Sequence, residues 1–169
     1  MNLSDSRVID ADRATVWAAI LDPEVLKTCV PGCQEMDGTP EDGFTATVVQ
    51  KVGPVKATFK GAVTLSEMEA PESVTIAGEG KGGAAGFAKG GAKVRLEAQG
   101  DQTVLHYDVE AKVGGKLAQL GSRIIDGFAK KMADQFFTNF QTHVGAPPAE
   151  ETEPSDDAPK KGWLKRLVT

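Results

Sequence analysis

Apolar and polar side chains alternate strictly over residues 55–65, which predicts a β-strand with one buried face. Five other segments are also expected to form strands, from shorter alternation or from composition: 33–37, 44–48, 74–76, 92–98 and 105–113. Successive strands joined by short connections are typical of antiparallel pairing, because parallel neighbours need a long crossover. The middle of the chain therefore predicts an antiparallel meander of six strands.

Helical signals stand on both sides of this meander. After an expected first strand over 3–10, Asp12 is a good N-cap for a short helix. Asp22-Pro23 ends that helix and starts a second one, with Asp22 as its cap and Pro23 at its first position. The second helix is expected to end at Pro31-Gly32.

A long helix is expected over residues 115–143, after the last strand. Its apolar side chains recur every three or four residues: Leu117, Leu120, Ile124, Phe128, Met132, Phe136 and Phe140. The order strand, two helices, six strands and long helix predicts an α+β fold, in which a curved antiparallel sheet wraps the last helix. One helix cannot fill a strongly curved sheet, so a cavity is expected between them, although such a stripe can equally form plain core.

Successive turns of a meander lie at alternate ends of the sheet, and the two ends differ in composition. The connections at 38–43, 69–72 and 99–102 are polar and acidic. The other end collects glycine and proline, which we interpret as the mouth of the cavity: Pro31, Gly32, Gly53, Pro54, Gly82, Gly83, Gly86, Gly114 and Gly115. Lysines flank it: Lys27, Lys51, Lys56, Lys81, Lys89 and Lys116. A basic mouth suits an anionic membrane surface; alternatively, glycine only eases tight connections.

Several function classes are disfavoured. A formal net charge of −5 argues against nucleic-acid binding, which usually needs a basic face. Gly78 to Gly83 match G-x-G-x-x-G, but no helix follows as a dinucleotide site requires. Cys29 and Cys33 are interpreted as ordinary thiols beside a turn, and no metal site is expected. The motifs of hydrolases and zinc proteases are absent, so we expect no catalytic residues.

The C-terminal part has a different composition from the body. Residues 145–159 are acidic and proline-rich and are expected to form a disordered linker, and residues 160–169 form a basic tail. As a helix, the tail would put apolar residues on one side and basic residues elsewhere: Trp163, Leu164, Leu167 and Val168 against Lys160, Lys161, Lys165 and Arg166. This pattern favours a peripheral membrane anchor. A disordered end, or a helix that docks on a protein, remains an alternative.

Four segments of the body resemble one known family. They are Cys-Val-Pro-Gly-Cys at 29–33, Gly-Pro-Val-Lys-Ala-Thr-Phe-Lys-Gly at 53–61, Gly-Gly-Lys-Leu-Ala-Gln-Leu-Gly-Ser-Arg-Ile-Ile-Asp-Gly at 114–127 and Ala-Lys-Lys-Met-Ala-Asp-Gln-Phe-Phe at 129–137. Residues 1–144 thereby resemble the carbon monoxide dehydrogenase CoxG family of the START-like (Bet v 1-like, SRPBCC) helix-grip superfamily. The resemblance implies a helix-grip fold with an apolar cavity. It also implies an accessory role beside molybdenum-containing carbon monoxide dehydrogenases, or related molybdenum hydroxylases, at the membrane.

These observations predict a non-catalytic protein that recruits such an enzyme to the cytoplasmic face of the cell membrane. The N-terminus lacks the features of a signal peptide, which favours the cytoplasm. The cavity is expected to bind a lipid-like molecule, most plausibly a quinone, with no covalent cofactor. Its expected wall is Phe59, Phe87, Phe128, Met132 and Phe136. Two rival interpretations are a cyclase- or hydrolase-type enzyme on the same fold and an assembly or docking module with a filled core.

Overall fold

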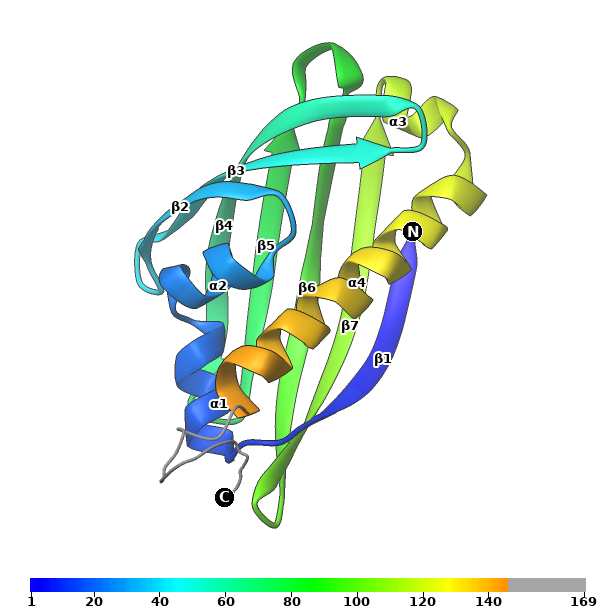
Figure 1. Cartoon of the computed structure of the whole chain (residues 1–169). Helices are drawn as coiled ribbons and strands as arrows, with labels where there is room; N and C mark the ends of the chain where they lie inside the picture. Colours follow the sequence, from blue (N-terminus) through cyan, green and yellow to red (C-terminus); the bar gives the residue numbers. More distant parts are fainter. Residues whose placement is uncertain (146–169) are drawn as a thin grey trace, which may run out of the picture.

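In the computed structural model, which describes residues 1–145, a seven-stranded antiparallel sheet wraps around a long C-terminal helix (Figure 1). The strands are β1 (Asn2–Ile9), β2 (Cys33–Thr39), β3 (Gly43–Val52), β4 (Val55–Glu69), β5 (Ser73–Lys81), β6 (Phe87–Gln99) and β7 (Gln102–Gly114). The helices are α1 (Arg13–Ile20), α2 (Pro23–Cys29), α3 (Lys116–Gln119) and α4 (Ser122–Gly145), and η1 (Gly83–Ala85) is a single 3₁₀ turn. The strand order β1-β7-β6-β5-β4-β3-β2 confirms the predicted meander and the helix-grip architecture.

The two short helices begin where their capping residues predict. The Asp12 carboxylate accepts a hydrogen bond from the backbone N–H of Thr15 at 3.4 Å, at the start of α1. The Asp22 carboxylate accepts one from the N–H of Glu24 at 2.9 Å, at the start of α2. Each cap satisfies a backbone donor that has no partner inside the helix.

The glycine-rich run 78–91, expected to be a loop, is mostly strand. Gly78 pairs with Gly90, and Glu79 pairs with Lys89, so that only residues 82–86 connect β5 to β6. Glycine carries no side chain, so a run of glycines shows no alternation even where its backbone is fully paired. The strand prediction for this region was therefore too short at both ends.

The helix expected over 115–143 is divided in two. Gly121 has φ +88°, a conformation that ends α3 and lets α4 start in a new direction at Ser122. The longer part, α4, then runs diagonally across the concave face of the sheet (Figure 1). Among residues 1–145, no helix combines the length and apolar composition that crossing a bilayer requires.

The packed core lies at one end of the grip, where α1, α2 and the C-terminal half of α4 cover the sheet. Its fully buried members include Ile9, Val16, Val74, Leu105 and Phe140. Phe140 comes from the last turns of α4, and Val16 comes from α1. The N-terminal half of α4 has no such layer of short helices between it and the sheet, which leaves room for a cavity.

Three connections gather at the opposite end, and we call them the rim: residues 53–54, 82–86 and 114–115. The β5–β6 connection and α3 mark this end at the top of Figure 1. The fourth expected part of the mouth, Pro31-Gly32, lies beside β3 instead, because the backbone N–H of Val49 donates to the Gly32 carbonyl at 2.9 Å. It therefore borders the cavity from the side rather than from the rim.

Candidate ligand-binding cavity

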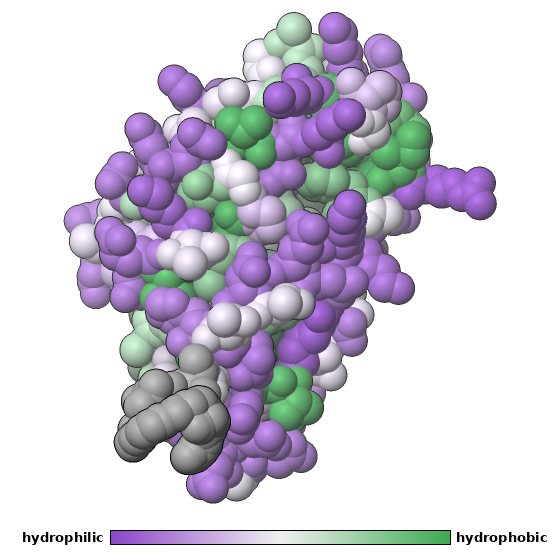
Figure 2. All heavy atoms as spheres, in the orientation of Figure 1, coloured by the Kyte–Doolittle hydropathy of each residue, from purple (hydrophilic) through white to green (hydrophobic). Residues whose placement is uncertain are grey.

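A cavity of about 610 Å³ lies between α4 and the concave face of the sheet. Its size falls within the range of pockets that hold a drug-sized ligand. All seven strands contribute to its lining, and the α4 wall consists of Ile125, Phe128, Ala129, Met132, Ala133, Phe136 and Phe137. Figure 2 shows apolar atoms near the rim, beside α3 and the start of α4, on a surface that is otherwise largely hydrophilic.

The cavity exists because the side chains that line it become small towards the rim. The sheet contributes Gly80, Ala88, Ala92 and Ala111 there, whereas Val94, Leu105 and Tyr107 line the end near the core. Helix α4 repeats the trend, since Ala129 and Ala133 precede Phe136 and Phe137. Glycine and alanine in facing positions cannot fill the distance between a helix and a sheet, so an empty volume remains.

Four of the five expected wall residues, Phe59, Phe128, Met132 and Phe136, line the cavity. Phe87 does not, and its placement in the wall was wrong. It is 43% exposed and packs beside Gly114, where an added Cβ would come within 2.2 Å of its ring. Along β6, Ala88 and Ala92 line the cavity, so Phe87 has the phase of the outward residues. Reading the phase of β6 back through its glycines would have placed Phe87 outside.

The sequence analysis missed two polar residues of the wall. Gln50 on β3 donates from Nε2 to the Pro31 carbonyl oxygen, and the same nitrogen lies 3.8 Å from Met132 Sδ on α4. Tyr107 on β7 stacks on Phe137 with ring centroids 5.2 Å apart. The alternation of 105–113 and the position of Gln50 between inward Val48 and Val52 are the signals that indicate both side chains point inwards.

The rim residues are held by close backbone approaches. Gly86 and Gly115 both have positive φ, and their backbones leave no space for a side chain between them. Across the opening, Gly53 lies against Ile124 and Leu120, at the start of α4. The other expected mouth residues have different surroundings: Gly82 lies against the Phe59 ring, Gly83 borders open space, Pro54 is exposed in the β3–β4 turn, and Gly114 contacts Phe87.

Lysines form like-charge pairs on the outer face of the sheet near the rim. Three registered cross-strand pairs consist of lysine alone: Lys51 with Lys56, Lys60 with Lys81, and Lys89 with Lys112. Directly opposed like charges destabilise a sheet, and the nearest compensating contact is Lys81 Nζ to Glu79 Oε2 at 3.9 Å. This concentration of positive charge contrasts with the acidic turns at the other end.

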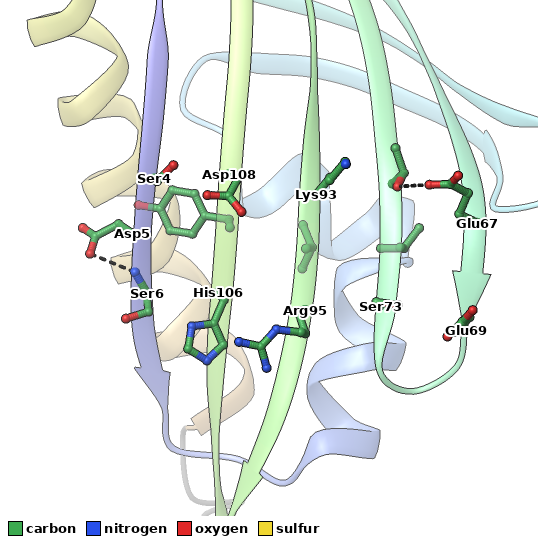
Figure 3. Close-up of a pocket in the computed structure, with 14 residues that line it drawn as sticks. Ser4, Asp5, Ser6, Glu67, Glu69, Ser73, Lys93, Arg95, His106 and Asp108 are labelled. Carbon is green, nitrogen blue, oxygen red and sulfur yellow. Dashed lines mark hydrogen bonds between the residues drawn. The ribbon is translucent and has the colours of Figure 1, made fainter.

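A second hollow of about 900 Å³ lies on the outer face of the sheet (Figure 3). It is larger than the cavity, but it is an open trough bordered by charges of both signs, among them Asp108, Lys93, Arg95 and Glu67. His106 Nε2 there lies 3.0 Å from Glu97 Oε1, a contact that lowers the pKa of Glu97. Such a surface suits water better than an apolar ligand, so we regard the inner cavity as the candidate site.

Cys29 and Cys33 are both free thiols, and burial raises the pKa of each. A raised pKa lowers the thiolate fraction, which agrees with their interpretation as unreactive cysteines. Among residues 1–145, no group of histidine, cysteine and carboxylate side chains is arranged to hold a metal ion. The proposed tail residues Lys160 to Val168 and most of the linker lie outside the described residues.

The family model for carbon monoxide dehydrogenase CoxG matches residues 6–145. Among solved structures, a conserved protein from Geobacillus kaustophilus has 27% sequence identity and a TM-score of 0.80, over 85% of this chain and 95% of that chain. A START superfamily protein from Mycobacterium smegmatis has 16% identity and a TM-score of 0.63, over 85% and 96%. Ara h 8.0201 has 14% identity and a TM-score of 0.59, over 85% and 97%. These neighbours establish a START/Bet v 1-like helix-grip fold, and no curated protein matches the chain by sequence.

Proposed function

Because the chain belongs to the carbon monoxide dehydrogenase CoxG family, we propose that it is a non-catalytic accessory protein which carries a hydrophobic ligand. Its partner is a molybdenum-containing carbon monoxide dehydrogenase or a related molybdenum hydroxylase. The protein recruits this enzyme to the cytoplasmic face of the membrane and couples it to the respiratory chain. The ligand is a quinone taken from the bilayer.

The apolar cavity of about 610 Å³ is the observation that carries this proposal. Its wall includes no lysine, arginine or carboxylate side chain among the described residues, so a charged ligand would lose its hydration without gaining a partner. A neutral molecule that is mostly hydrocarbon fits this wall. A quinone meets that description, and it is also the lipophilic electron acceptor that a membrane-bound oxidising enzyme needs.

The rim and the tail support a membrane as the source of the ligand. The lysine pairs near the rim favour an anionic surface, where each basic residue contributes about 1 kcal/mol. The tail adds four basic residues and an interfacial Trp163. Ordering its ten residues costs about 1–2 kcal/mol each for the backbone, which offsets most of that gain, so the attachment is weak and reversible.

The two rival functions fit the cavity less well. An enzyme on this fold needs polar groups that converge on a substrate, whereas Gln50 and Tyr107 are the hydrogen-bonding side chains in the described wall. A docking module with a filled core would have large side chains where Gly80, Ala88 and Ala92 lie. Neither the wall nor its empty volume favours these alternatives over ligand carriage.

Extraction of the purified protein with organic solvent, followed by mass spectrometry, tests the ligand. We expect a bound quinone or related lipid, and we expect ligand-free protein to take up quinone from liposomes. A protein that yields no lipid and takes up no quinone would refute carriage. Co-purification from native membranes tests the partner, and we expect a molybdenum hydroxylase to be recovered with the chain.

Flotation with anionic liposomes tests the tail separately. A variant that lacks residues 160–169 is expected to lose most of its liposome association. The matched control replaces Trp163, Leu164, Leu167 and Val168 by alanine and keeps the four basic residues, which separates apolar from electrostatic binding. Unchanged flotation of the deletion variant would exclude the tail as an anchor.

A further inference from the structure

We infer that the side-chain amide of Gln50 is the polar anchor of the cavity and that it holds a ring oxygen of the bound ligand. This inference rests on the proposed function, because it specifies how a quinone would be recognised. It assigns a binding role to a residue that would otherwise only connect parts of the fold.

Three elements fix the position of Gln50. Its side chain extends from β3, where Val48 and Val52 on either side also line the cavity. Its Nε2 donates to the Pro31 carbonyl oxygen of the α2–β2 connection and lies 3.8 Å from Met132 Sδ on α4. The amide is therefore preorganised at the place where the connection, the sheet and the helix meet.

The hydrogen bond to Pro31 also determines which way the amide faces. A carbonyl oxygen must be met by the nitrogen of the amide, so Oε1 is the other polar atom. Among the described residues, Oε1 accepts no hydrogen bond, and it is not sealed away from solvent-sized space. The second N–H of Nε2 has only the thioether of Met132 nearby, which is a weak acceptor.

Gln50 thus offers one N–H and one carbonyl oxygen to a ligand. A quinone carries ring carbonyls that only accept hydrogen bonds, and it uses the N–H. The corresponding quinol, which has gained two electrons and two protons elsewhere, carries hydroxyls that donate, and it uses Oε1. A side chain with both functions binds the oxidised and the reduced form alike, as a carrier between a membrane and an enzyme requires.

The other polar side chain of the wall is less suited to this role. The Tyr107 hydroxyl accepts a hydrogen bond from Arg7 Nη2 at 3.3 Å and lies next to the Asp134 ion pair, where β1 meets α4. Its environment is therefore already polar and connected. Gln50 is surrounded by Val48, Val52 and Met132, so its unused amide atoms have no other means of compensation inside the cavity.

Calorimetric titration of the full chain with three probes tests the anchor: menadione, its anaerobically reduced quinol, and methylnaphthalene, which has the same ring without oxygen. Gln50→Met keeps the length of the side chain and removes both hydrogen-bonding functions. We expect it to weaken binding of menadione and of the quinol about fivefold, the effect of one lost hydrogen bond, and to leave methylnaphthalene unchanged. The matched control is Thr47→Val on the outer face of β3, which should alter none of the three.

A purely structural role for Gln50 would weaken all three probes equally, and that result would overturn the inference. Unchanged binding of menadione and its quinol would also overturn it. The wild-type protein gives a second readout that needs no variant: the infrared carbonyl band of bound menadione should split, with one carbonyl shifted to lower frequency. An unsplit band contradicts the anchor, whereas failure of the wild type to bind any of the probes refutes the proposed ligand class itself.

Discussion

Arg7 on β1 and Asp134 on α4 form an ion pair, with 2.6 Å between Arg7 Nη2 and Asp134 Oδ1. The Arg7 guanidinium also donates to the Tyr107 hydroxyl at 3.3 Å and lies 5.0 Å from the centre of the Phe137 ring. β1 is an edge strand of the sheet, and α4 is the helix that the sheet grips. One cation therefore joins the edge of the sheet to the helix beside the cavity.

Removal of this ion pair is expected to destabilise the fold slightly. Asp134 is 56% exposed, so solvent screens the pair, and Asp134→Asn should lower the free energy of unfolding by about 0.5–1 kcal/mol. Arg7→Met should cost more, because it also removes the contacts with Tyr107 and Phe137. Urea unfolding measures both. Asp126→Asn, elsewhere on α4, is the control, and equal effects of the two asparagine variants would contradict a specific role for the pair.

Filling the cavity should abolish ligand uptake without unfolding the protein. Ala133 lies in the α4 wall, and Ala133→Phe places a ring in the empty volume. We expect uptake of quinone from liposomes to fall more than tenfold, while the melting temperature is kept or raised by the added apolar contact. Phe128→Ala makes the opposite change, and it should lower the melting temperature but preserve uptake. Normal uptake by Ala133→Phe would place the ligand elsewhere.

Reversing charge near the rim should weaken binding to anionic vesicles. Lys51 and Lys56 pair across β3 and β4, and replacement of both by glutamate should reduce the affinity more than tenfold, from about 1 kcal/mol per basic residue. The loss should shrink at high salt. Lys93→Glu with Arg95→Glu changes the net charge equally on the same face but lies away from the rim. Co-sedimentation in which both double variants lose equally would show that only net charge matters.

Ionisation of Asp12 should stabilise the start of α1 in a pH-dependent way. A hydrogen bond from the Thr15 hydroxyl is the main cause that holds the pKa of Asp12 below its ordinary value. Since the pKa is lower in the folded state, this stabilisation is complete above the ordinary carboxylate pKa, about 4, and is lost as the pH falls through the folded value. Asn is also a good N-cap, so Asp12→Asn isolates the charge.

Melting temperatures of the wild type and of Asp12→Asn, measured by circular dichroism from neutral pH to pH 3, check this prediction. The difference between the two proteins should be constant above about pH 5 and should shrink below pH 4. Thr15→Val removes the hydroxyl and should reduce the pH-dependent part. A difference that stays constant down to pH 3 would exclude Asp12 as the source.

Periodicity and capping were enough to predict the order of the elements. The alternation over 55–65 corresponds to part of β4, and Asp12 and Asp22 cap the helices as expected. Side-chain patterns report only on residues that have side chains, however. The paired glycines of β5 and β6 therefore escaped detection, and the error carried over to Phe87, whose phase could be read only through them.

The candidate site was predictable in outline but not in its chemistry. The apolar stripe of the last helix identified Phe128, Met132 and Phe136, because a helical phase depends on local sequence alone. The role of Gln50 depends on Pro31, 19 residues before it, and on Met132, 82 residues after it. Only the tertiary fold brings these residues together, and a single glutamine in an alternating strand does not stand out.

The separation of the packed core from the cavity has an evolutionary consequence. Phe140, Val16 and Leu105 hold the molecule together at one end, whereas Ala88, Ala92, Ala129 and Ala133 shape the empty volume at the other. Substitutions among these alanines can therefore change which molecule is accepted while the end that determines folding stays intact. A scaffold divided in this way can acquire new ligands by single mutations, without passing through unfolded intermediates.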